Sequence, residues 1–271
     1  MSTINDVLFG GAVLAKARDN EKYRTSILLL FLNGVRKRIL NKKPITNNFL
    51  GTSGYDYLST PHACRMNGFR TGRKIMDIKF EELIGSFMES RTGICERFMS
   101  GELAGRLREN LLQLDQTDRM KPAGIGNQTR DPTQTTRGDK VSWIDPLSNE
   151  VSERAFLDQI ENFIGYLNDS CYTGINAYEF HYALYETGSS YKRHVDQFSN
   201  NSDRKFSMIH YLNDAWLPED GGELWIHHPG KLEKIQPNIR KAVFFQSDEC
   251  EHEVREASRP RMSITGWLKS T

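Results

Sequence analysis

From residue 177 onward, apolar and polar residues alternate in short runs separated by turns rich in Gly, Pro and Asn. Seven such runs predict strands over residues 177–186, 190–195, 205–212, 222–227, 241–247, 252–256 and 261–268. A period of two is typical of a strand with one buried face. Because no helical pattern lies between these runs, they predict an antiparallel sandwich or jelly roll.

Upstream of these strands the apolar period lengthens to three or four residues, which is the period of an amphipathic helix. Two stripes of this kind lie within residues 77–114, and a third occupies residues 152–170. The polar, turn-rich residues 119–140 predict a long loop. We therefore expect a mainly β fold, in which a jelly-roll core over residues 174–271 packs on supporting helices from residues 76–173.

Charge separates the chain into two parts, although the 271 residues together carry a formal net charge of only +1. Residues 1–75 hold 13 basic and 4 acidic side chains, whereas residues 76–271 hold 23 basic and 31 acidic ones. We interpret the first part as a basic N-terminal extension of unknown role. The alternative is a basic arm for nucleic acid, which we expect to be the only route to such a partner.

Other totals exclude further classes of protein. The longest apolar run, Ile27 to Leu32, is far shorter than the roughly 20 residues that a membrane span needs, so we expect no membrane partner. The four cysteines lie far apart without a CxxC pair, at Cys64, Cys95, Cys171 and Cys250. This spacing is typical of reduced thiols, so we expect a cytoplasmic protein.

His194-Val195-Asp196 is the first candidate for chemistry. On a strand, residues i and i+2 face the same side, so the His194 imidazole and the Asp196 carboxylate converge on one point. A borderline transition metal accepts this pair of ligands. The motif alone is weak evidence, because HxD occurs by chance in many proteins.

His252 supplies a third ligand from a distant strand, 56 residues after Asp196. The two sheets of a jelly roll face each other across a central space, so ligands from both ends of this segment can meet there. Two His and one Asp on one side of a metal leave three positions open, which is the facial triad of non-haem Fe(II) oxygenases.

Arg261 opens the last predicted strand, on which alternation places it on the same face as Ser263, Thr265 and Trp267. An arginine on the inner face of a barrel needs a charged partner, because an unpaired buried charge is very costly. The planar guanidinium matches a carboxylate. A dicarboxylic co-substrate that chelates iron at one end would supply this carboxylate at the other.

These residues resemble the prolyl 4-hydroxylase branch of the 2-oxoglutarate- and Fe(II)-dependent dioxygenases, in particular the oxygen-sensing prolyl hydroxylase domain enzymes and their bacterial relatives. The likeness extends in order over roughly residues 95–271, through Arg137-Gly138-Asp139-Lys140-Val141-Ser142-Trp143-Ile144, Tyr182-Ala183-Leu184-Tyr185, Tyr191-Lys192-Arg193-His194, Ile209-His210-Tyr211-Leu212-Asn213, Trp216, Gly221-Gly222-Glu223-Leu224 and Phe244-Phe245-Gln246-Ser247-Asp248.

The resemblance implies a role for each matching residue. His194, Asp196 and His252 would be the iron ligands, and Arg261 would bind the distal carboxylate of 2-oxoglutarate. Tyr185, Tyr211 and Thr265 would line the co-substrate pocket, and the loop with Arg137 and Asp139 would fold over the peptide substrate. The turn from Glu186 to Ser190 is one residue shorter than in the oxygen sensors, which weakens the match at Tyr185.

The implied activity is hydroxylation of a prolyl residue in a protein or peptide, coupled to conversion of 2-oxoglutarate and O2 to succinate and CO2. The implied cofactor is Fe(II), with ascorbate as an accessory reductant. Two alternatives remain open. One is a non-catalytic, cupin-like jelly roll that binds a metal or ligand; the other is a related oxygenase that acts on nucleic acid or a small molecule.

Overall fold

The computed structural model of the protein describes residues 76, 78–124, 137–197 and 202–271. The predicted basic extension, residues 1–75, lies outside these described residues, as do residues 125–136 of the predicted loop. The chain divides into two units, and residues 166–173, at the end of a helix, are the described part of the smaller one. All the strands of the described residues belong to the larger unit.

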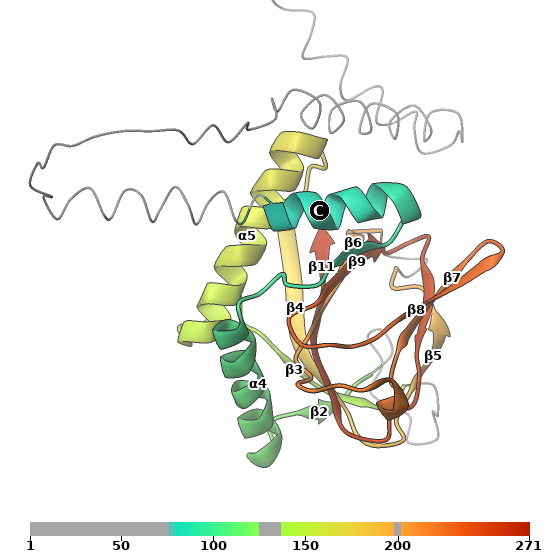
Figure 1. The fold of residues 1–271 in the computed structure, drawn as a ribbon. Helices are drawn as coiled ribbons and strands as arrows, with labels where there is room; N and C mark the ends of the chain where they lie inside the picture. The colour runs from blue at the N-terminus through green and yellow to red at the C-terminus, as the bar shows by residue number, and fades with distance from the viewer. Residues whose placement is uncertain (1–75, 77, 125–136, 198–201) are drawn as a thin grey trace, which may run out of the picture. The chain divides into compact units, whose positions relative to one another are not determined.

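Two antiparallel sheets form the centre of this larger unit (Figure 1). The first has the strand order β1-β9-β6-β11-β4-β3-β2, with bounds β1 Gly93–Cys95, β9 Ala242–Gln246, β6 Arg204–Tyr211, β11 Arg261–Lys269, β4 Ala177–Tyr185, β3 Asp139–Trp143 and β2 Lys121–Pro122. The second has the order β5-β10-β7-β8, with bounds β5 Tyr191–His194, β10 Glu251–Val254, β7 Leu224–His228 and β8 Lys231–Ile235.

This arrangement confirms the predicted jelly-roll class, and each of the seven predicted strands is present within about two residues of its expected bounds. The seven-stranded sheet also contains β1, β2 and β3, which come from the segment predicted to be helical support. The structure therefore has strands on both sides of residue 174. The division into a helical support and a jelly-roll core stays a prediction.

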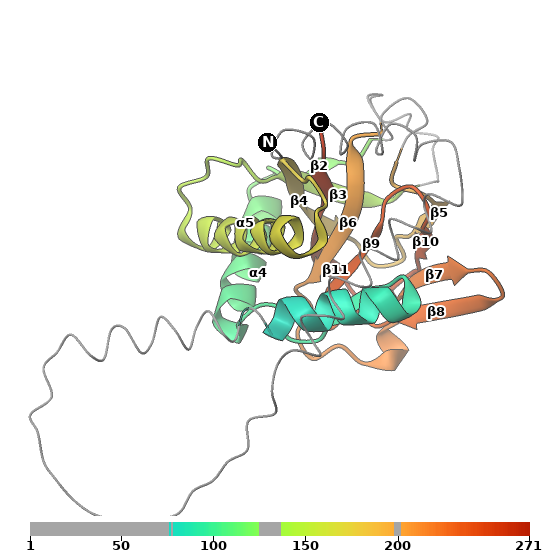
Figure 2. The same ribbon diagram turned by 90° about the horizontal axis from the view of Figure 1, so that it is seen from above.

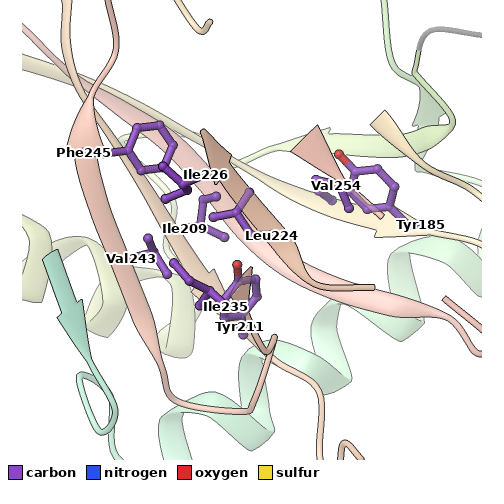
Figure 3. Close-up of a cluster of buried hydrophobic side chains, with 10 residues drawn as sticks. Tyr185, Ile209, Tyr211, Leu224, Ile226, Ile235, Val243, Phe245 and Val254 are labelled. Atoms are coloured by element: carbon purple, nitrogen blue, oxygen red, sulfur yellow. The ribbon is translucent and has the colours of Figure 1, made fainter. Parts of the chain in front are cut away.

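Apolar side chains fill the space between the two sheets, and Figure 3 shows them meeting there. Ile209, Val243 and Phe245 come from the seven-stranded sheet, and Leu224 and Ile226 come from the four-stranded one. All five are at most 5% exposed. Burial of each such side chain contributes about 1.5–3 kcal/mol, so this cluster holds the two sheets face to face.

The other face of the seven-stranded sheet is covered by helices (Figure 2). Residues 78–90 form one helix, followed by α4 (Gly101–Gln116) and α5 (Val151–Cys171). Their aromatic residues meet those of the sheet edge-on: Phe156 lies 5.3 Å from Phe180 on β4, and Phe163 lies 5.6 Å from Phe244 on β9, between ring centroids. The central strands of the sheet are thus covered on both faces.

Local capping interactions determine where the two labelled helices begin. The Ser100 hydroxyl accepts a hydrogen bond from the Leu103 N–H, which caps α4. At α5 the Glu150 carboxylate accepts from the N–H groups of Ser152 and Glu153, so the helix begins one residue before the predicted start. Within the described residues, none of the helices has the length and apolar character that a membrane crossing requires.

Candidate metal centre

His194 and His252 lie opposite each other on neighbouring strands, because β5 and β10 pair antiparallel with these two residues in register. Their ring centroids are 4.3 Å apart. Asp196 lies two residues beyond the end of β5. One ligand atom from each of the three residues lies within 4.8 Å of the other two, and they form the one cluster of this kind in the described part of the chain.

Backbone carbonyl groups fix the orientation of both imidazoles. The Nδ1 atom of His194 lies 2.7 Å from the carbonyl oxygen of Lys192, and that of His252 lies 3.0 Å from the carbonyl oxygen of Cys250. A carbonyl oxygen only accepts, so each Nδ1 must carry the proton. The Nε2 atoms are then the unprotonated ones, and they lie 3.5 and 3.7 Å from the Asp196 carboxylate oxygens.

Asp196 is held from two sides. Its backbone N–H donates to the carbonyl oxygen of Ser247 at 3.1 Å, and its Oδ2 accepts from the Ser207 hydroxyl at 2.7 Å. The Ser207 and Ser247 hydroxyls are hydrogen-bonded to each other at 2.9 Å. Burial by itself would raise the Asp196 pKa, but the two imidazoles and the Ser207 hydroxyl outweigh it and hold that pKa well below its ordinary value.

These three donors fit a divalent transition metal. Burial lowers the pKa of His252, although Asp196 opposes the shift, so its imidazole remains neutral and keeps a lone pair on Nε2. Two neutral nitrogen donors and one carboxylate are the set that Fe(II) takes in facial triads. Metal-binding histidines usually donate their other ring N–H to a nearby acceptor, and metal-binding carboxylates usually accept a further hydrogen bond. Both features are present here, at the Nδ1 atoms of His194 and His252 and at the Asp196 carboxylate.

Arg261 lies at the other end of the pocket and is only 1% exposed. Its Nε donates to the Gly222 carbonyl oxygen at 2.8 Å, while its Nη2 has no hydrogen-bond partner among the described residues. The guanidinium carbon lies 5.2 Å from the ring centroid of Tyr185 and 5.1 Å from that of Tyr211. The Tyr211 hydroxyl is likewise buried without a described partner.

An uncompensated buried guanidinium is costly, so this end of the pocket fits a carboxylate. Arg261 Nη2 and the Tyr211 hydroxyl are two donors with unused capacity, and a carboxylate is an acceptor with room for both. Burial raises the pKa of Tyr211 despite the nearby Arg261, so its hydroxyl keeps its proton and can donate. The fit is to one end of a dicarboxylate whose other end reaches the metal.

Gly222 is required at the turn that holds Arg261. Its φ is +68°, a left-handed conformation that disfavours side chains, and a Cβ there would lie 2.9 Å from the Ala257 Cβ and 3.3 Å from the Arg261 Cδ. The carbonyl oxygen that orients Arg261 therefore depends on glycine.

Arg137 and Asp139 pair with each other beside the metal centre. The Arg137 Nε and Nη2 donate to the two Asp139 oxygens at 2.6 and 2.9 Å, and Asp139 is 2% exposed. The Arg137 guanidinium carbon lies 4.9 Å above the Tyr191 ring, which stacks on His194 at 3.6 Å between centroids. The guanidinium fork is thus engaged by Asp139, and the pair forms part of the wall next to His194.

One pocket is lined by eight of the nine residues that the sequence predicts for the site: Arg137, Asp139, Tyr185, His194, Asp196, His252, Arg261 and Thr265. The ninth, Tyr211, is not among these lining residues, but its ring centroid lies 5.1 Å from the guanidinium carbon of Arg261. The pocket wall also contains His181, which was not predicted as a site residue. Alternation on β4 carried the signal, because residues 181, 183 and 185 share one face.

Comparison with known proteins places this site in a family context. Residues 180–269 match the model of the 2OG-Fe(II) oxygenase superfamily. Over 232 residues the chain is 27% identical to Egl nine homolog 1 of Rattus norvegicus, which covers 78% of this chain and 64% of that protein. Egl nine homolog 1 of Homo sapiens is 28% identical over 192 residues, covering 66% and 44%. The chain thus spans less than two thirds of the length of these curated relatives.

Two solved structures extend the comparison. A prolyl-4-hydroxylase from Pseudomonas putida is 29% identical, with a TM-score of 0.64, over 71% of this chain and 99% of that one. A prolyl hydroxylase from Trichoplax adhaerens, solved with a peptide fragment of the hypoxia-inducible factor oxygen degradation domain, is 22% identical with a TM-score of 0.67 over 73% and 92%. The second likeness shows the fold alone.

Proposed function

Starting from the 2OG-Fe(II) oxygenase domain to which residues 180–269 belong, we propose that the protein is a dioxygenase that hydroxylates a prolyl residue of a protein or peptide. The reaction consumes 2-oxoglutarate and O2 and yields succinate, CO2 and the hydroxylated residue. One observation carries this proposal: the same pocket contains a His-Asp-His donor set and, at its other end, a buried arginine with an unused N–H.

In this proposal His194, Asp196 and His252 hold Fe(II). The two imidazole Nε2 atoms and the Asp196 carboxylate would supply the three protein ligands, and a three-ligand set of this kind would leave coordination positions for 2-oxoglutarate and O2. The bound iron supplies the activation of O2 for oxidative decarboxylation of the co-substrate. The protein contributes orientation: two backbone carbonyls keep the imidazoles in the required tautomer, and Ser207 holds the carboxylate.

Arg261 and Tyr211 bind the distal carboxylate of 2-oxoglutarate in the same proposal. The Gly222 carbonyl oxygen holds Nε, so the guanidinium directs Nη2 rather than Nε at the ligand. Tyr185 lies against the guanidinium, and Thr265 lines the same pocket. Two buried donors for a second carboxylate would favour a dicarboxylate over a monocarboxylic 2-oxo acid.

The substrate class rests on a relative, because the Pseudomonas putida structure, which is 29% identical, is described as a prolyl-4-hydroxylase. We propose a proline-containing peptide here as well. Arg137 and Asp139 would contribute as a paired wall beside the substrate, since the guanidinium is already engaged. The free thiols Cys95, Cys171 and Cys250 favour a cytoplasmic location, and ascorbate would keep the iron reduced.

Succinate formation tests the proposal. Purified protein is incubated with Fe(II), 2-oxoglutarate and ascorbate, with and without a panel of proline-containing peptides. Succinate is then quantified, and the mass of each peptide is measured by mass spectrometry. We expect succinate from wild type, none from His194→Ala, and the gain of one oxygen on a proline. Equal succinate from both proteins would contradict the iron assignment.

The cupin-like alternative makes a different prediction about Arg261. A non-catalytic binder would need only the three metal ligands and not this arginine. Its affinity for 2-oxoglutarate would therefore not respond to Arg261→Ala. We expect the dissociation constant to rise at least 10-fold, because the variant loses a charge-assisted bidentate interaction. Calorimetric titration with 2-oxoglutarate measures it without turnover.

A further inference from the structure

His181 is a buried histidine on the pocket wall whose two ring nitrogens have no hydrogen-bond partner among the described residues. It lies on β4, two and four residues before Ala183 and Tyr185, and shares their pocket-facing side. A buried polar group normally has a partner, so two unmet nitrogens at a pocket wall indicate that a ligand provides one.

Two tryptophan rings lie beside the His181 ring. The Trp143 ring lies 4.8 Å away and the Trp267 ring 5.5 Å away, between centroids. Trp143 is 57% exposed, so this aromatic group reaches from the pocket to the protein surface. The two indole rings are also neighbours of each other, 6.3 Å apart between centroids, and the imidazole nitrogens remain without partners among the described residues.

His181 is distant from the arginine end of the pocket. Strands β4 and β11 pair Tyr185 with Arg261 and His181 with Thr265, so four residues separate the two positions along the sheet. At ~3.3 Å per residue this is about 13 Å. Four C–C bonds of about 1.5 Å span at most about 6 Å, so the backbone separation of the two positions exceeds the length of a five-carbon co-substrate.

The imidazole is neutral in this environment. Burial, followed by the nearby charges of Arg137 and Arg204, lowers the His181 pKa to about 3. A neutral imidazole carries one N–H donor and one acceptor nitrogen. A peptide carbonyl group therefore finds an N–H donor here at neutral pH.

We propose that His181 is a substrate-binding residue that donates a hydrogen bond to a backbone carbonyl oxygen of the peptide, next to the residue that is hydroxylated. This inference rests on the proposed function. A carbonyl is the favoured partner because a prolyl residue has no N–H, so its flanking peptide groups present acceptors to the enzyme. The tryptophans would hold the apolar part of the same segment, and the buried N–H would fix its register over the metal.

Peptide affinity tests this role. Protein loaded with Mn(II) and 2-oxoglutarate is titrated calorimetrically with synthetic peptides that each contain one central proline. We expect His181→Leu to raise the peptide dissociation constant about 5- to 30-fold, because a carbonyl is left buried without a donor. His181→Gln restores a donor and is expected to remain within about threefold of wild type.

His210→Leu is the matched control, because His210 is also buried with two unpartnered nitrogens among the described residues but lies among Phe98, Phe156 and Phe180, away from the pocket. We expect it to leave the peptide dissociation constant at the wild-type value. As a second measurement, the ring nitrogens of His181 should shift in the ¹⁵N spectrum of wild type on addition of peptide, and those of His210 should not.

Each other outcome overturns the inference in a recognisable way. An unchanged peptide dissociation constant in His181→Leu would mean that water, and not the peptide, is the hydrogen-bond partner of the imidazole. An equal loss of 2-oxoglutarate affinity would assign His181 to the co-substrate. If wild type forms succinate but binds no peptide of the panel, the peptide substrate and this inference fail together, while the dioxygenase activity stands.

Discussion

The Ser207 hydroxyl donates a 2.7 Å hydrogen bond to Oδ2 of Asp196, and both groups are buried. This bond leaves Asp196 one fixed orientation toward His194 and His252. Removal of such a supporting bond typically lowers metal affinity 10- to 100-fold. We therefore expect Ser207→Ala to weaken Fe(II) binding by at least about 10-fold, measured by competition with a chelator of known affinity.

Ser247→Ala is the graded control for that measurement. Its hydroxyl touches Ser207 rather than Asp196, so its loss should weaken iron binding less. Equal iron affinity in wild type and Ser207→Ala would mean that the backbone around Asp196 suffices to orient the carboxylate.

Replacement of Gly222 should impair co-substrate binding through Arg261. Gly222→Ala strains a residue at φ +68° and places a Cβ against Ala257 and the Arg261 side chain. We expect the 2-oxoglutarate dissociation constant to rise several-fold. Gly230→Ala is the matched control, since Gly230 has φ +74° and a Cβ added there would meet nothing within 4 Å; it should cost about 1 kcal/mol of stability and leave 2-oxoglutarate affinity intact.

The buried hydroxyl of Tyr211 should matter where that of Tyr182 does not. Tyr211→Phe removes a donor beside Arg261, so we expect 2-oxoglutarate to bind about 10-fold more weakly, the equivalent of ~1.4 kcal/mol. Tyr182 is equally buried, but on β4 it alternates with His181 and Ala183, which line the pocket, so it lies on the opposite face of the sheet. Similar 2-oxoglutarate affinities for both variants would remove Tyr211 from the co-substrate site.

Acid should destabilise the fold partly through His210. Burial lowers the pKa of His210 to about 3, whereas in the unfolded chain it is about 6.5. The unfolded chain therefore binds the proton first, so this contribution to stability is complete above pH 6.5 and is lost as the pH falls toward 3. The slope from one such group reaches about 1.4 kcal/mol per pH unit.

His210→Leu should flatten this dependence. Urea unfolding at pH 7, 6, 5 and 4 gives the free energy of unfolding at each pH, and the variant should lose less of it than wild type over this range. His181 titrates in the same direction, so part of the slope will remain. Parallel curves for the two proteins would show that His210 is already hydrated in the folded state.

Strand positions could be predicted from the sequence where the residues on the two faces of a strand differ in kind and therefore alternate. The run from Arg261 to Leu268 alternates between pocket and core residues, and β11 has nearly the predicted bounds. By contrast β8 was missed, because Lys231–Ile235 is an edge strand whose charged side chains resemble a turn. β1 was missed because three residues, Gly93–Cys95, are too few for a period.

The candidate ligands were predictable because strand geometry relates sequence spacing to direction. This holds for His194 on β5 and for His252 on β10. Asp196 lies two residues past the end of β5, so the expected strand geometry does not extend to it, although its carboxylate still meets the two imidazoles. What determines their orientation was beyond such reasoning: Ser207 reaches Asp196, and the Gly222 carbonyl reaches Arg261, only because distant segments meet in the fold. Likewise, His181 resembles a core or edge histidine in the sequence, and only the fold brings it to the pocket wall.

The carbonyl groups behind the two histidines have one more consequence. Lys192 and Cys250 take part in the metal centre through main-chain atoms that every amino acid possesses, in the same i−2 relation to each histidine. Substitutions at positions 192 and 250 therefore change surface charge and thiol chemistry around the metal while the acceptors remain. The surroundings of the metal can therefore be altered by substitution at these two positions while the three ligands and their hydrogen-bond acceptors stay the same.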